Sequence, residues 1–172
     1  DLLIMRFTDV VMSVPPLVLL IALVSIVGPG LRNIILAIGL MSWPGPARIV
    51  RGQVLSLREQ DFVTAAKAVG DSPLRIIFQH ILPNALSPVI VTATLQVASA
   101  ILLEASMSFL GLGIPPPTPS WGNMLQDART IRILESMPWL WLAPGLAIVI
   151  CVLSMNFIGD GLRDALDPRM SR

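Results

Sequence analysis

Long apolar runs separated by short polar segments occupy most of this 172-residue chain. Four of them approach the length of a membrane-spanning helix, since 1.5 Å per residue carries about 20 residues across a hydrocarbon core of about 30 Å. A backbone in lipid must satisfy its own hydrogen bonds, which favours helices. The pattern predicts an all-α membrane protein with about four transmembrane helices, over residues 10–28, 33–57, 84–104 and 139–159.

Prolines fall inside several of these runs, at positions 15, 16, 44, 46, 88 and 144. In a soluble helix each would break the hydrogen-bond ladder. Membrane helices tolerate proline where neighbouring groups satisfy the freed carbonyls. We interpret "SWPGPAR", residues 42–48, as a kinked or locally unwound part of the second helix, and the functional alternative is a hinge.

Composition supports lipid as the main solvent of the chain. Only 13% of the residues are charged, against about a quarter in ordinary soluble domains. The net charge of +1 gives no reason to expect a nucleic-acid partner. The single cysteine, Cys151, cannot form an internal disulfide, and His80 has no cysteine or histidine partner at metal-ligand spacing. We therefore expect no metal site.

Basic residues predict the orientation, because cytoplasmic loops are enriched in arginine and lysine. With four spans, nine basic residues fall on one side and three on the other. The nine are Arg6, Arg48, Arg51, Arg58, Lys67, Arg75, Arg163, Arg169 and Arg172; the three are Arg32, Arg129 and Arg132. Both ends, the insert at residues 61–83 and the tail at residues 160–172 are predicted to be cytoplasmic, and residues 113–138 to form an extracytoplasmic loop.

The insert between the second and third spans is longer than a simple turn requires. Phe62, Ala65, Ala66 and Val69 share one face of a predicted short helix. Gly70 suits the left-handed position that ends a helix. Ser72 and Pro73 then suit the N-cap and first position of a second short helix.

We expect that second helix to carry Ile76, Ile77, His80 and Ile81 and to end at Leu82-Pro83. Periodicity alone suits an amphipathic pair that packs on its own bundle or on lipid headgroups. The small alanine face and the doubly specified bend favour a protein partner instead, since surface-binding helices usually carry bulky apolar and strongly basic faces.

The segment "TAAKAVG…HILPN" resembles the EAA loop of membrane subunits of bacterial ABC importers. Ala65-Ala66, Gly70 and Leu82-Pro83 match the family spacing, whereas Thr64 replaces the acidic residue. "SWPGPARIVRGQVLSLRE", "EASMSFLGLGIPPPTPSWGNML" and "NFIGDGLRDALDPR" resemble the peptide/nickel-type permeases. These blocks extend over nearly the whole chain, and the resemblance implies that further helices precede Asp1.

The resemblance implies a type I importer permease core in a bacterial or archaeal cytoplasmic membrane. Its implied partners are a second permease subunit, two cytoplasmic ATPases, an extracytoplasmic solute-binding protein and membrane lipid. ATP and Mg²⁺ would bind the ATPases; this chain has no Gly-x-x-x-x-Gly-Lys-Ser/Thr phosphate loop and is expected to be non-enzymatic and to bind no cofactor. The residues expected to couple it to the ATPase are Asp61, Ala65, Ala66, Lys67, Gly70, Asp71, Ser72, Pro73, His80, Leu82 and Pro83.

A second group of candidate residues lies at the predicted outer side. Pro115, Pro116, Pro117 and Pro119 predict a stiff, extended segment, either a rigid connector or a docking site for the binding protein. Glu104 is expected to make a packing or gate hydrogen bond, with a substrate role as the alternative. The remaining candidate in the outer group is Trp121. Arg163 and Asp167, four residues apart in the tail, can form an ion pair.

The leading hypothesis is a permease subunit that forms the path for peptides or related small solutes. An ATP-independent secondary transporter or channel is the alternative, but such proteins usually carry paired charges at mid-membrane, and the four runs have none. A non-transporting scaffold would leave the shaped insert without a role.

Overall fold

The computed structural model describes residues 1–166, and within this range helices are the only regular secondary structure, as predicted. Three helices are long and apolar enough to cross a membrane, or four if one bent pair counts as a span. The helices are α1 (Leu2–Met12), α2 (Pro16–Val27), α3 (Leu31–Ser42), α4 (Pro44–Leu57), α5 (Asp61–Ala68), α6 (Pro73–Arg75), a π-helical segment (Ile76–Ile81), α7 (Leu82–Phe109), α8 (Trp121–Asp127), α9 (Ile131–Ser136) and α10 (Trp139–Leu166).

The first predicted span is not one straight helix, so that expectation was wrong. Helices α1 and α2 meet at an angle of 87°. Pro15 adopts an extended conformation, with φ −55° and ψ 133°, because the ring of Pro16 disfavours a helical residue before it. Pro16 then begins α2, where its missing N–H costs nothing.

Helices α3 and α4 together form one membrane-length helix, Leu31–Leu57, interrupted only at Trp43. Helix α1 lies along α4 and is attached to it by side chains. The Arg48 guanidinium lies 2.6 Å from the Asp9 carboxylate, and Arg51 contacts Asp1 at 2.9 Å. Because Trp43 is the one non-helical residue within Leu31–Leu57, the kinked or unwound part predicted over residues 42–48 is limited to a single-residue interruption.

The third membrane helix is longer than predicted. Residues Pro73–Phe109 form one continuous helix, so the expectation that Leu82-Pro83 ends a separate short helix was wrong. The π-helical segment lies just before Pro83, where Leu82 donates its N–H to the carbonyl of Ile77. This wider turn provides room for a proline that would otherwise clash with the preceding turn.

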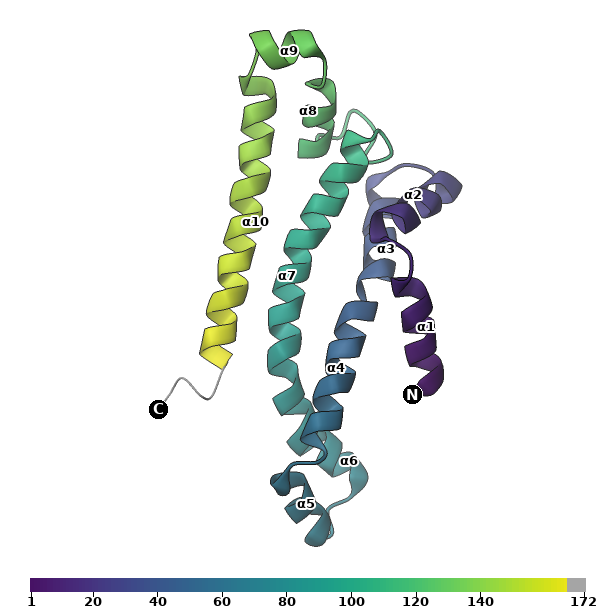
Figure 1. The fold of residues 1–172 in the computed structure, drawn as a ribbon, viewed down its shortest axis with the longest axis vertical. Helices are drawn as coiled ribbons and strands as arrows, with labels where there is room; N and C mark the ends of the chain where they lie inside the picture. Colours follow the sequence, from purple (N-terminus) through teal and green to yellow (C-terminus); the bar gives the residue numbers. More distant parts are fainter. Residues whose placement is uncertain (167–172) are drawn as a thin grey trace.

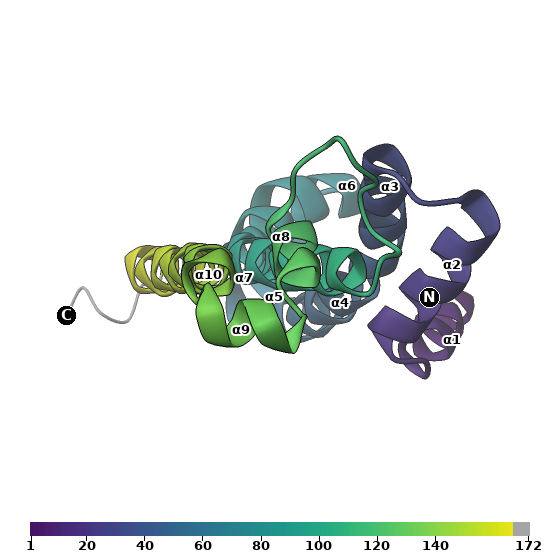
Figure 2. The same cartoon turned by 90° about the horizontal axis from the view of Figure 1, so that it is seen from above.

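Helices α7 and α10 run antiparallel, side by side, with α8 packed against both (Figures 1 and 2). The α5–α6 region lies at one end of the molecule and α8–α9 at the other (Figure 1). A buried cluster joins α2, α3, the end of α7 and the segment after it: Leu20, Val24, Ile34, Ala37, Met107 and Ile114. Residues 113–138 are thus partly helical, and Asp167, Arg169 and Arg172 of the predicted tail lie outside the described residues.

Candidate functional site

The bend between α5 and α6 is built as the local sequence predicts. Gly70 has φ +88°, which L-residues rarely adopt. Its N–H donates to the carbonyl of Lys67, and the next N–H, from Asp71, donates to Ala66. This pair of bonds is a Schellman cap, which satisfies carbonyls that the helix end leaves free. The predicted role of Gly70 as the helix terminator is confirmed.

The second half of the bend starts a new helix immediately. The Ser72 hydroxyl accepts a hydrogen bond from the N–H of Arg75 at 3.4 Å, and Pro73 occupies the first helical position. Both predictions for these residues are confirmed. We call residues 61–83 the elbow, because one cap ends α5 and another begins α6 within four residues.

A small apolar cluster holds the elbow against the membrane helices. Val63 has no exposed surface and packs with Ile76 and Ile81. Val54 and Leu57 at the end of α4 pack around these three residues, as does Ala66. The elbow is therefore attached both to α4 and to the beginning of the long Pro73–Phe109 helix.

Polar contacts orient the same bend. The Asp71 carboxylate lies 3.5 Å from the Arg75 guanidinium and 3.5 Å from Nε2 of His80. The His80 ring also lies beside Phe62, with ring centroids 6.5 Å apart. Partly exposed ion pairs contribute little to stability, so we interpret these contacts as fixing the angle of the elbow.

The outer surface of the elbow exposes bulky apolar side chains. Val69 is 87% exposed, Leu74 68% and Phe78 62%. Val69 lies at the end of α5, and Leu74 and Phe78 lie on the Pro73–Phe109 helix that follows the capped turn. The rest of the described chain leaves their apolar surface uncovered. We call these three residues the elbow patch.

The predicted coupling residues all lie on the elbow, but not on one face of it. Ala66 faces the buried cluster and is half-buried, so the expected pairing of Ala65 with Ala66 on one docking surface is not what the structure shows. Asp71 and His80 are half-buried at the bend. The others are exposed: Asp61, Ala65, Lys67, Gly70, Ser72, Pro73, Leu82 and Pro83.

At the opposite end of α7 the outer candidates form a separate group. Ser108 is fully buried, donates a 2.6 Å hydrogen bond to Glu104 and accepts one from the N–H of Ile114. The Asn123 side chain donates to the carbonyl of Ile114 at 2.6 Å. Glu104 thus makes a packing hydrogen bond that helps to attach residues 110–138, which we call the outer segment, to α7. The exposed outer candidates are Pro115, Pro116, Pro117, Pro119 and Trp121.

Replacing Glu104 should show what its hydrogen bond contributes to packing. Glu104→Gln retains an oxygen that accepts from Ser108, so we expect the free energy of unfolding to change little. Glu104→Leu leaves the buried hydroxyl with one partner fewer and should lower the free energy of unfolding by about 1–3 kcal/mol. Thermal unfolding of both variants would check this, and equal stability of the two would contradict the packing role.

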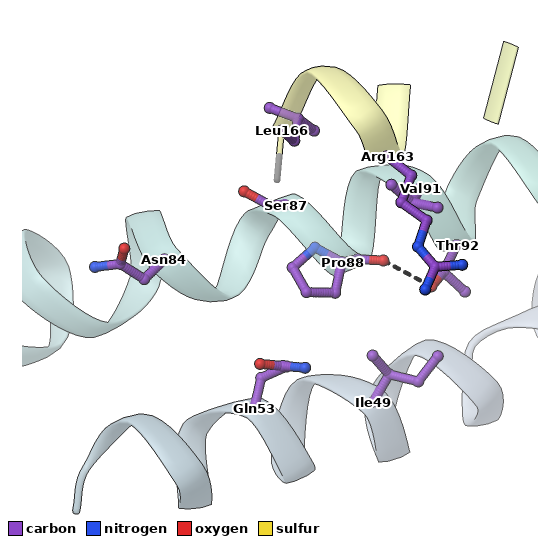
Figure 3. A pocket seen from close by; sticks show the side chains of 9 residues that line it. All are labelled: Ile49, Gln53, Asn84, Ser87, Pro88, Val91, Thr92, Arg163 and Leu166. Atoms are coloured by element: carbon purple, nitrogen blue, oxygen red, sulfur yellow. Dashed lines mark hydrogen bonds between the residues drawn. The ribbon is translucent and has the colours of Figure 1, made fainter. Parts of the chain in front are cut away.

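A pocket of about 520 Å³ lies between α4, α7 and the end of α10. Figure 3 shows its wall, with Gln53 and Ile49 on one side and Pro88 and Thr92 on the other. Asn84, Ser87, Val91, Arg163 and Leu166 complete the lining. Amide, hydroxyl and guanidinium groups therefore face a space in the elbow half of the molecule, which sequence reasoning missed because the lining comes from three separate helices.

Metal chemistry has no support in the described part of the chain. No group of three or more His, Cys, Asp or Glu side chains among residues 1–166 is placed to hold an ion. Cys151 is half-buried and unpaired within this range. The main structural features of the described residues are the capped elbow, the long continuous helix and the pocket between helices.

Comparison with known proteins finds several similar permease proteins. A peptide permease protein of Brucella ovis is 52% identical over 98% of this chain and 56% of its own length. The dipeptide transport system permease protein DppC of Alkalihalophilus pseudofirmus is 51% identical, over 99% of this chain and 55% of its own. The glutathione transport system permease protein GsiD of Shigella flexneri is 45% identical, with the same coverage.

The chain spans about half the length of the curated relatives it matches. The model of one protein family, the binding-protein-dependent transport system inner membrane component, matches residues 1–172. The earlier resemblance to importer permeases is thereby confirmed, and this chain belongs to the family of binding-protein-dependent transport system inner membrane components.

Proposed function

We propose that this chain is the part of an importer permease that couples a solute path to a separate ATPase. The observation that carries the proposal is the elbow, whose patch of Val69, Leu74 and Phe78 is exposed around a turn that is capped on both sides. An apolar surface presented on a fixed shape is typical of a docking site for another protein. Family membership supplies the setting of a transport system.

The partners follow from the same setting. We propose that two cytoplasmic ATPases bind the elbows of this chain and of a second permease subunit, and that ATP and Mg²⁺ bind the ATPases. A solute-binding protein delivers cargo at the α8–α9 end, near the exposed Pro115, Pro116, Pro117 and Pro119. Peptides or related small solutes are the proposed cargo, supported by the names of the relatives.

Orientation is part of the proposal. The elbow end carries Arg48, Arg51, Arg58, Lys67 and Arg75, whereas the α8–α9 end carries Arg129 and Arg132. By the positive-inside rule the elbow faces the cytoplasm, where ATP is available. The chain then crosses the cytoplasmic membrane several times, with both of its ends on the inner side.

The deciding test is uptake by the complete transporter in reconstituted vesicles. We expect uptake of a labelled peptide to require the binding protein and ATP on the elbow side, and to stop when the phosphate-loop lysine of the ATPase is replaced. Uptake that instead follows an imposed ion gradient without ATP would establish the secondary-transporter alternative and overturn the proposal.

Docking at the elbow can be tested by single-cysteine cross-linking to the ATPase. The background is Cys151→Ala, and Ala65→Cys places a thiol on the exposed surface of α5. A matched control, Leu146→Cys, places one on the exposed face of α10, away from the elbow. Cross-links from position 65 and none from 146 are expected; equal or reversed yields would place the ATPase elsewhere.

A further inference from the structure

One side chain joins the break between α3 and α4 to the middle of α7. Pro46 has no backbone N–H, so the carbonyl of Ser42, four residues earlier, loses its helical donor. Nε2 of Gln96 on α7 donates a 2.6 Å hydrogen bond to that carbonyl oxygen. Gln96 therefore supplies from another helix the donor that Pro46 removes.

The surroundings suit this contact. A Cβ added at Gly45 would lie 3.8 Å from Nε2 of Gln96, an ordinary van der Waals distance, so Gly45 lies directly beside the amide without crowding it. The Ser42 hydroxyl donates to the carbonyl of Ile38 at 2.6 Å, a bond within the helix that often accompanies bending. Lipid offers no other donor for the freed carbonyl.

Beyond the break, α4 connects this contact to the elbow. Val54 and Leu57, at its end, pack in the elbow cluster. Between these two attachments lies the pocket, with Gln53 on the α4 wall and Thr92, one turn from Gln96, on the α7 wall (Figure 3). At one end of the pocket Ser42, just before α4, is thus bonded to α7, and at the other end α4 packs in the elbow cluster.

We propose that Gln96 is a positioning residue that fixes the pivot about which α4 swings, so that movement of α5, the part of the elbow that packs on the end of α4, opens and closes the pocket. The proposal rests on the proposed function, because it takes the elbow to be the part that the ATPase moves. The hydrogen bond to Ser42 keeps the pivot in place, since Ser42 is the last residue of α3, directly before the break that begins α4, and its donor lies on α7.

The test uses the complete transporter in vesicles, with Cys151→Ala and a reporter Gln53→Cys in the pocket wall. The measured quantity is the rate at which a membrane-impermeant thiol reagent labels the reporter, in the nucleotide-free state and in the vanadate-trapped state. Gln96→Met keeps the side-chain length and removes the donor. We expect it to reduce the ratio of the two rates by about threefold or more, the effect of losing one interhelical hydrogen bond.

Two further variants distinguish loss of the pivot from a general loss of stability. Ser99→Ala, on the same helix, removes a hydroxyl that bonds only the carbonyl of Leu95, and the ratio should be unchanged. Pro46→Ala restores a backbone N–H for Ser42, so Gln96→Met in that background should have less than about half its effect, as coupled residues do.

The outcomes are distinguishable. The pivot is overturned if Gln96→Met leaves the ratio of labelling rates unaltered, or if it causes the same loss with and without Pro46. In either case ATP-driven uptake by the unsubstituted transporter still supports the proposed function. Uptake that does not depend on ATP overturns both the proposed function and the pivot. A loss in Gln96→Met that Pro46→Ala suppresses supports both.

Discussion

Replacing Gly70 with tryptophan is expected to uncouple ATP hydrolysis from uptake while the transporter remains assembled. The φ of +88° makes any L-residue strained at this position, by about 1–2 kcal/mol. A Cβ added at Gly70 would meet no atom within 4 Å, so we expect the indole to project from the bend into the space next to the elbow. Strain of this size would lower the ratio of the native bend to its unstrained alternatives by about 5- to 30-fold. The added bulk would also obstruct a docked partner.

The measurements are ATP-driven uptake, ATPase activity of the complex and co-purification of its subunits. Gly52→Trp is the matched control, because Gly52 is also exposed, lies on α4 and has open space around it. It should retain most of the uptake. Gly70→Asn should fall between the two, since asparagine tolerates left-handed backbone better than most residues. Normal uptake in Gly70→Trp would show that the elbow does not transmit the movement.

Replacing Gly122 with alanine is expected to detach the outer segment from α7. Gly122 is buried where α8 crosses α7, and a Cβ there would collide with the backbone carbonyl of Ala105 and lie 2.7 Å from Cβ of Ser108. A backbone group cannot move aside as a flexible side chain can. We expect the free energy of unfolding to fall by about 1–3 kcal/mol, as when a methyl group is forced into a packed contact.

Thermal unfolding of the purified transporter and stimulation of its ATPase by loaded binding protein would both report this change. The control is Gly145→Ala in α10, where a Cβ has open space and alanine favours the helix. That variant should be as stable as the original or slightly more so. Equal stability of Gly122→Ala and Gly145→Ala would contradict the close packing of α8 on α7.

Sequence reasoning succeeded where a few neighbouring residues decide the structure. Gly70, Ser72 and Pro73 end and begin helices through local backbone chemistry, and the structure confirms each of them. Three of the four apolar runs likewise lie in single helices of membrane length, because a backbone in lipid has few other choices.

The predictions were wrong where packing between residues far apart in the sequence decides the structure. Residues 62–69 contain two overlapping apolar sets, and the prediction followed Phe62 and Val69, whereas Val63 and Ala66 face the cluster. Pro83 does not end its helix because a π-helical turn accommodates it. The contact between Gln96 and Ser42 depends on how α7 lies against α4, which a single sequence does not reveal.

The unbroken helix Pro73–Phe109 has a thermodynamic consequence for the proposed transporter. At 1.5 Å per residue its 37 residues extend about 55 Å, from the elbow to the Glu104 and Ser108 contacts. Coupling between its two ends must be reciprocal: if nucleotide on the ATPase alters the affinity for binding protein at the far end, binding protein must alter the affinity for nucleotide by the same factor. Binding titrations begun from either end should therefore yield one coupling free energy.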